Sequence, residues 1–250
     1  MGLWNSLKSL IGGKTRVVYN PDIDELQLIL GYRFTNPNIL KHALAHRSCC
    51  YNDTGRLSSN ERLEFLGDSV LGLAIAELLY KDHPDLREGE LTKTKALLVN
   101  ETTLSIIGEE IGLHRFIVMS PEEDRSGGRY RPSIVSDSFE SIMGAVYLDG
   151  GSEAASDLVF RLIYSRKKEI LSDESQRNFK GELLELVQSR GEGMPQYRVI
   201  SQEGPDHCKV FEIEVYIGST RYGTGTGRSK KEAEQKAAAA TFEKFPPQHD

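Results

Sequence analysis

Cysteine is scarce in this sequence of 250 residues, and its positions exclude a disulfide framework. Cys49 and Cys50 are adjacent, Cys208 is remote from both, and no C-x-x-C pair suggests a zinc or redox site. There is also no run of about 20 apolar residues that could span a membrane. Residues 1–14 lack the apolar core and cleavage site of a signal peptide. We therefore expect a cytoplasmic protein with reduced thiols and no membrane partner.

An excess of basic residues is missing as well. The formal net charge is −6, and it divides into −5 for residues 1–173 and −1 for residues 174–250. A nucleic-acid backbone is attracted by local positive potential, which a net charge does not report. Any nucleic-acid-binding face must therefore be a focused patch. The surplus acid is either solvated surface or a site for cations.

The first part of the chain has apolar residues at helical spacing almost throughout. Residues 121–133 are polar and predict a loop, while Gly150 and Gly151 predict the end of a helix. After an N-terminal extension of residues 1–22, we therefore predict an all-α domain over residues 23–172. Its predicted helices are Ile23–Leu30, Pro37–His46, Glu61–Tyr80, Leu91–Gly112 with breaks near Asn100 and Gly108, Ile134–Leu148 and Glu153–Leu171.

The pattern changes after Ser172, where the polar residues 173–178 predict a linker. Alternating apolar residues then predict strands over 197–200, 211–217 and 221–226. Helices are predicted before and after them, over Phe179–Arg190 and Lys230–Phe245. The chain is therefore predicted as multidomain, an all-α domain followed by a small α+β domain over residues 179–246 with the order α-β-β-β-α.

Three acidic residues share one face of the helix predicted over Glu61–Tyr80. Glu61, Glu64 and Asp68 are spaced i, i+3 and i+7. The other faces are apolar, which predicts a core helix, and ionised carboxylates in a core cost several kcal/mol each unless a positive group compensates them. Glu61 has a second interpretation, because Ser58 three residues earlier would form a capping box with it. Asp68 lies deep in the apolar run, so a cation site is the better interpretation there.

A second acidic pair, Asp137 and Glu140, repeats the i, i+3 spacing on another apolar helix. If the two helices face each other, Glu64, Asp68 and this pair offer only hard oxygen ligands, which suit Mg²⁺ or Mn²⁺ better than Zn²⁺. The chemistry that such a set indicates is phosphoryl transfer. Two metals roughly 4 Å apart can activate a water molecule and stabilise a leaving oxygen.

The segment NERLEFLGDSVLG resembles the signature of the ribonuclease III family. The segments LGYRF, ALAHRS, HPDLREGELTK and SGGRYRPSIVSDSFESIMGAVYLDGG follow the order of that family, and the resemblance covers almost all of residues 25–245. It implies an all-helical, divalent-metal-dependent endonuclease domain that forms a homodimer. The family cuts double-stranded RNA and leaves 5′ phosphates and 3′ overhangs.

The resemblance also assigns residues. It implies a Mg²⁺ site, in which Mn²⁺ can substitute, without a small-molecule cofactor. Phe65 is placed at the dimer seam, although a plain core role is equally consistent with the sequence. Pro132 departs from the family pattern and would affect the shape of the loop, while His46 is expected to be structural. The metal ligands are Glu64, Asp68, Asp137 and Glu140, with Asp68 and Glu140 the most important for catalysis, and Glu61 contacts RNA or the dimer partner.

The C-terminal α-β-β-β-α order resembles a double-stranded-RNA-binding domain. Lys230 and Lys231 begin a helix, where the backbone amides also favour phosphate. The resemblance assigns minor-groove contacts to Glu185, Gln188 and His207. Two departures weaken the match, since Leu184 stands where glutamine is frequent and Glu234 where some domains carry a third lysine.

Two other functions are compatible with parts of the sequence. A non-catalytic RNA scaffold would keep the fold, but it would have little reason to retain buried acids that lose stability without metal. A metal-stabilised helical interaction protein would not explain the RNA-binding module. A nuclease that matures ribosomal RNA precursors and other structured transcripts accounts for both parts of the chain.

Overall fold

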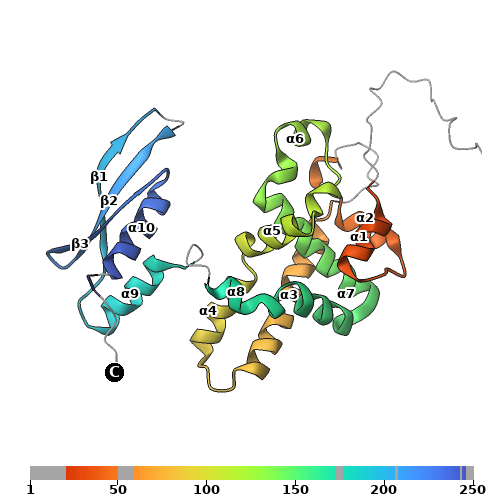
Figure 1. Cartoon of the computed structure of the whole chain (residues 1–250), viewed down its shortest axis with the longest axis horizontal. Helices are drawn as coiled ribbons and strands as arrows, with labels where there is room; N and C mark the ends of the chain where they lie inside the picture. Colours follow the sequence, from red (N-terminus) through yellow and green to blue (C-terminus); the bar gives the residue numbers. More distant parts are fainter. Residues whose placement is uncertain (1–20, 50–58, 173–176, 206–207, 243, 246–250) are drawn as a thin grey trace, which may run out of the picture. The chain divides into compact units, whose positions relative to one another are not determined.

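The computed structural model describes residues 21–49, 59–172, 177–205, 208–242 and 244–245. The chain divides into two compact units, one ending at Asp173 and the other beginning at Glu174 (Figure 1). The first unit is helical and the second contains the only sheet found among the described residues. In those same residues, no helix is both long and apolar enough to cross a bilayer.

The first unit is an all-α domain, as predicted. Its longest helices, α3 and α7, lie side by side and form the centre of the unit, with the shorter helices around them (Figure 1). Short 3-10 turns follow several helices, at Arg47–Cys49, Leu113–Arg115, Gly128–Tyr130 and Tyr164–Arg166. The α-helices are α1 (Ile23–Leu30), α2 (Pro37–Ala43), α3 (Glu61–Asp82), α4 (Glu88–Leu98), α5 (Glu101–Glu110), α6 (Pro121–Arg125), α7 (Pro132–Leu162) and α8 (Lys167–Ser172).

Glycines allow α3 and α7 to approach each other at backbone distance. A Cβ atom added at Gly67 of α3 would overlap the carbonyl oxygen of Glu140 on α7 and lie 2.5 Å from its carbonyl carbon. A Cβ atom at Gly144 would overlap the carbonyl oxygen of Leu63 in the same way. The hydroxyl of Ser141 also donates across the crossing, to the carbonyl of Asn60 at 3.2 Å. The two acid-bearing helices are therefore held in register by contacts between their backbones.

Several predicted helix limits were wrong, for local reasons. The helix from Pro37 ends at Ala43 rather than His46, because the chain pairs with Val118 through Leu44 O and His46 N. The predicted loop 121–133 contains α6, which the side chain of Ser120 caps at the amide of Glu123, and α7 already begins at Pro132.

Glycine was a poor guide to helix ends in this unit. Gly108 does not break α5, which continues to Glu110. At Gly151 the backbone leaves helical geometry (φ 79°, ψ −173°), but the chain resumes its helix, so α7 runs from Pro132 to Leu162 with a kink. The helix predicted over Glu153–Leu171 is divided, because a 3-10 turn separates the end of α7 from α8.

The second unit has the predicted order α-β-β-β-α. Its antiparallel strands β1 (Gln196–Glu203), β2 (Val210–Ile217) and β3 (Thr220–Gly227) lie in chain order, and α9 (Phe179–Ser189) and α10 (Lys230–Phe242) complete the unit. The alternating residues of β2 face the helices as predicted: Ile213, Val215 and Ile217 are buried with Leu183 and Val187 of α9 and with alanines of α10.

Strand β3 lies unusually close to α10. Cβ atoms at Gly223, Gly225 and Gly227 would each lie within 2.7 Å of a backbone atom of that helix. The opposing residues of α10 are alanines, Ala233 and Ala237, which are fully buried. Small side chains on both elements thus bring the start of α10 against the sheet.

Candidate functional site

The predicted acidic residues come from both sides of the α3–α7 crossing. Glu64 and Asp68 belong to α3, while Asp137 and Glu140 belong to α7. The backbone of Glu140 is itself the contact point of Gly67, which lies next to Asp68. The structure therefore brings the two predicted acidic pairs together, although they are about 70 residues apart in the sequence.

Burial and mutual repulsion perturb these carboxyl groups. Burial is the largest cause that raises the pKa of Glu140 to about 8, and neighbouring negative charges add to it. Those charges are, in decreasing order of effect, Asp68, Asp137 and Glu64. Burial also raises the pKa values of Glu64 and Asp137, and Arg47 opposes both shifts. The acids therefore form one electrostatically coupled group whose excess negative charge favours a bound cation.

Helix α3, which was predicted as a core helix because its other faces are apolar, is buried on one side only. Glu64 is partly buried, but Asp68 and Glu61 are exposed. Phe65, between them in sequence, has 78% of its surface exposed. The helix packs through Leu63, Gly67 and Leu71, so its opposite side faces solvent despite its apolar residues. The acidic group consequently opens to solvent at Asp68 and is partly buried at Glu64, Asp137 and Glu140.

The capping box predicted for Glu61 was also wrong. The helix α3 begins at Glu61 itself, with Asn60 at the N-cap, whereas Ser58 lies outside the described residues. The carboxylate of Glu61 accepts a hydrogen bond from the hydroxyl of Ser59 at 2.6 Å and lies 3.8 Å from Arg47. Glu61 is thus an exposed residue at the edge of the acidic group.

The donor set suits a hard divalent cation, since it consists of carboxylates alone. Within the described residues, however, no three His, Cys, Asp or Glu side chains converge closely enough to hold a metal ion. The residues therefore fit a divalent cation in chemical type, and α3 and α7 bring them to one crossing.

A polar cavity of about 190 Å³ lies beside the acidic group. Glu64 and Asp137 line it together with Arg47, Arg131 and Glu123. Arg131 forms an ion pair with Glu123 at 2.9 Å, and Arg47 is largely exposed. The cavity thus gives solvent access to two of the acids, with positive groups at its wall.

His46 lies at the same cavity, and its contacts are those of a structural residue. Its Nδ1 lies 2.9 Å from the hydroxyl of Ser48, and its backbone amide bonds Val118. Burial lowers the pKa of the imidazole. These bonds are consistent with the predicted structural role.

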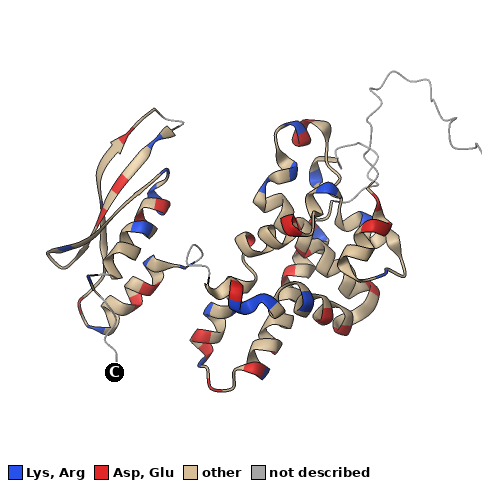
Figure 2. Ribbon diagram, viewed as in Figure 1, with Lys and Arg blue, Asp and Glu red and all other residues tan. Residues whose placement is uncertain are grey.

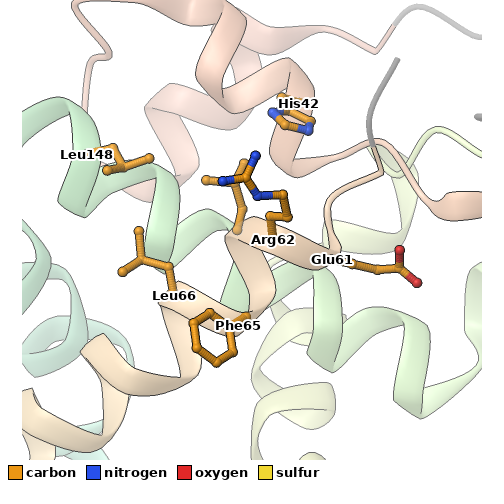
Figure 3. A pocket seen from close by; sticks show the side chains of 7 residues that line it. His42, Glu61, Arg62, Phe65, Leu66 and Leu148 are labelled. Atoms are coloured by element: carbon orange, nitrogen blue, oxygen red, sulfur yellow. The ribbon is translucent and has the colours of Figure 1, made fainter. Parts of the chain in front are cut away.

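An apolar hollow of about 630 Å³ lies on the solvent side of α3 (Figure 3). Leu66 of α3 and Leu148 of α7 lie on the same side of it, next to Arg62, and His42 lies above. Phe65 lines it too but extends into solvent. A large exposed aromatic ring beside an apolar hollow is unusual for a free surface and typical of an interface.

The predicted RNA-binding residues of the second unit are exposed. Glu185 and Gln188 lie on α9, and Lys230 and Lys231 form the first turn of α10. His207 lies outside the described residues. Acidic and basic residues alternate along both units, and neither sign dominates either ribbon (Figure 2). A basic face must therefore be local, as the sequence predicted.

Sequence reasoning missed the residues that set the crossing. Gly67 and Gly144 each interrupt an apolar helical run, and an isolated glycine in such a run is a signal of close packing that could have been used. Arg47 was missed because its place beside Glu64 and Asp137 depends on the fold of residues far apart in sequence.

Comparisons with known proteins agree with both units. The model of a ribonuclease-III-like family matches residues 36–167, and that of the double-stranded RNA binding motif matches residues 179–244. Ribonuclease 3 of Streptomyces coelicolor is 46% identical over 213 residues, covering 85% of this chain and 76% of the relative. Ribonuclease 3 of Pelotomaculum thermopropionicum is 45% identical over 219 residues, covering 86% of this chain and 91% of the relative.

Solved structures give the same result for the first unit. The nuclease domain of ribonuclease III from Campylobacter jejuni is 42% identical, with a TM-score of 0.54, and the match covers 58% of this chain and 97% of that one. The description of that structure refers to a region involved in dimer formation. On the family model, the relatives and the fold together, this chain belongs to the ribonuclease III family, the endoribonucleases of double-stranded RNA.

Proposed function

We propose that this protein hydrolyses phosphodiester bonds of double-stranded RNA at the α3–α7 crossing by a divalent-metal mechanism. The products would carry 5′ phosphates and 3′ overhangs. The observation that carries the proposal is the coupled group of acids from two helices, in which Glu140 is partly buried and its pKa is raised to about 8. A structural helix pair gains nothing from such a group, whereas a cation site needs it.

The chain's own residues have distinct roles in this proposal. Glu64, Asp68, Asp137 and Glu140 would hold Mg²⁺, or Mn²⁺ in its place, through carboxylate oxygens. Glu140, whose pKa is raised to about 8, would orient the site, and the exposed Asp68 would face the RNA. A divalent cation bound there would supply positive charge against the negative charge that develops on the phosphate and would lower the pKa of a nearby water molecule.

The decisive experiment is cleavage of a long, fully paired RNA with Mg²⁺ by the wild type and by Glu140→Gln. This variant keeps the size of the side chain and removes its charge. Short duplex products from the wild type alone support the proposal, and Ca²⁺ in place of Mg²⁺ tests the metal chemistry. If the wild type binds the duplex but cuts it with neither Mg²⁺ nor Mn²⁺, the protein is an RNA scaffold.

The second unit would bind the RNA and deliver it to the nuclease. Lys230 and Lys231 would contact phosphates, and Glu185 and Gln188 would enter the minor groove, where A-form shape and 2′-hydroxyls are recognised. His207 would enter the next groove. We place this module at residues 179–246, with the nuclease at 23–172. Ribosomal RNA precursors and other structured transcripts are the substrates that we propose.

We also propose that the protein is a homodimer through the solvent side of α3. Phe65 is 78% exposed and Leu148 is 57% exposed, and both border the apolar hollow. A two-fold interface presents the same patch from each copy, so an exposed ring and an adjacent hollow can complement each other. Sedimentation of Phe65→Glu tests this: a monomer is expected, and a dimer as stable as the wild type would disprove the interface.

A further inference from the structure

Lys180 lies at the junction of the two helices that carry the proposed RNA contacts. It belongs to the first turn of α9, and its Nζ lies 2.5 Å from Oε2 of Glu234 on α10. Lys180 also lies over the ring of Tyr197, 4.8 Å from its centroid. The Lys180 side chain is 34% exposed, so the ammonium group is both held in place and open to solvent.

The position of Glu234 fixes where this ammonium group lies. Glu234 follows Lys230 by four residues and Lys231 by three, which places all three side chains on one face of α10. A second bridge joins the same helix ends, because the side chain of Gln235 bonds the backbone amide of Lys180. Lys180 therefore contacts α10 about one helical turn from the two lysines that start that helix.

Lys180 lies on the side of α9 that faces α10. Leu183 and Val187 follow it by three and seven residues and are buried, so all three residues share one side of the helix. Lys180 therefore extends the phosphate contacts of α10 and not the minor-groove contacts of α9.

Lys180 offsets the negative charge that Glu234 brings to this face of α10. On the α10 face, Glu234 cancels one of the two lysine charges and leaves +1. Adding Lys180 restores +2, which is the charge of Lys230 and Lys231 alone. The sequence departure at Glu234 is therefore compensated in space by a residue from another helix.

We propose that Lys180 binds an RNA phosphate and that Glu234 is a positioning residue, which holds the ammonium group between the two helices. This rests on the proposed function of the second unit. The ring of Tyr197 borders the ammonium group and limits its movement. Among the residues that the structure describes, the buried hydroxyl of Tyr197 has no hydrogen-bond partner, so packing holds the ring. Lys180 then extends the phosphate-binding surface that Lys230 and Lys231 form at the start of α10.

The test measures binding of the full chain to an RNA duplex of about 16 base pairs, in EDTA so that metal-dependent cleavage is prevented, over a range of salt. Each lost phosphate contact makes the slope of log K against log salt less steep by about 0.9. When the salt concentration rises from about 0.05 M to about 0.2 M, the wild type should therefore lose roughly 3.5-fold more affinity than Lys180→Gln. Lys180→Arg should keep the wild-type slope.

Lys236→Gln is the matched control. Lys236 forms an ion pair with Glu232 at 2.7 Å. Because Lys236 follows Glu234 by two residues, it lies on the opposite side of α10 from the proposed surface. It should leave affinity and slope unchanged. Lys231→Gln is the positive control, because Lys231 is one of the proposed phosphate contacts and should lower the slope.

The outcomes separate the two proposals. If Lys231→Gln lowers the slope while Lys180→Gln does not, the inference about Lys180 is wrong and the RNA-binding function stands. Equal losses in Lys180→Gln and Lys236→Gln would overturn it too, as a general effect of charge. A wild type that does not bind the duplex overturns the proposed function together with the inference.

Discussion

Replacing Gly67 by alanine tests whether the backbone contact of α3 and α7 positions the acidic group. The new Cβ atom would lie 2.5 Å from the carbonyl carbon of Glu140, whereas two carbon atoms in contact are about 3.5–4.0 Å apart. The helices must therefore separate by about 1 Å. Overpacking of this kind costs about 1–3 kcal/mol, and a misplacement of about 1 Å can lower activity roughly 100-fold.

Gly72→Ala is the matched control in the same helix. No atom of the described residues lies within 4 Å of a Cβ atom at Gly72, so the higher helix propensity of alanine should stabilise the protein by about 0.4–1 kcal/mol. Thermal unfolding and duplex-RNA cleavage should be measured for both variants. A change of about 1 kcal/mol shifts the midpoint by roughly 2–4 °C in a protein of this size. A Gly67→Ala variant as stable and active as Gly72→Ala would refute the reasoning.

Three further changes test other parts of the structure. In metal-free protein, Glu140→Gln should be more stable than the wild type, because the folded-state pKa of Glu140, about 8, exceeds the unfolded value of 4.5 and ionisation therefore opposes folding. The gain should grow between about pH 5 and pH 9 and reach on the order of 3 kcal/mol. Urea titrations at each pH check this, and a difference that does not change with pH would contradict it. Removing residues 174–250 should weaken cleavage at limiting enzyme and make it less sensitive to salt, since phosphate contacts are lost; unchanged cleavage at physiological salt would show that the second unit is dispensable. Gly225→Val should unfold the second unit, because the new side chain would overlap the backbone of α10, whereas Thr224→Val at an exposed position should not. Amide hydrogen exchange can distinguish the two variants. Equal protection in both would mean that the close approach of β3 to α10 is not required.

The fold class could be predicted because each unit has a strong periodic pattern. The alternation along β2 and the helical spacing of α1 needed no tertiary information, and both elements form where the sequence indicated. The errors lie where a distant contact decides. The helix from Pro37 ends early because its last residues pair with Val118, and α6 forms from polar residues because Ser120 caps it and Pro121 can occupy its first position.

The candidate site was predictable in its residues but not in its form. Spacing alone placed two acids on each of two helices, and the family signature named them. It could not show that Asp68 is exposed while Glu140 is partly buried, since that depends on which side of α3 meets α7. Nor could it find the pair of Lys180 and Glu234, which are 54 residues apart and meet only because α9 packs against α10.

The three glycines of β3 also bear on how the second unit folds. A strand with Gly223, Gly225 and Gly227 has little intrinsic preference for the extended state and offers no side chains to a partial core. It gains its stability when α10 covers it, and the buried alanines of α10 pack against that strand as well as against β2 and α9. We therefore expect β3 and α10 to form together in one cooperative step.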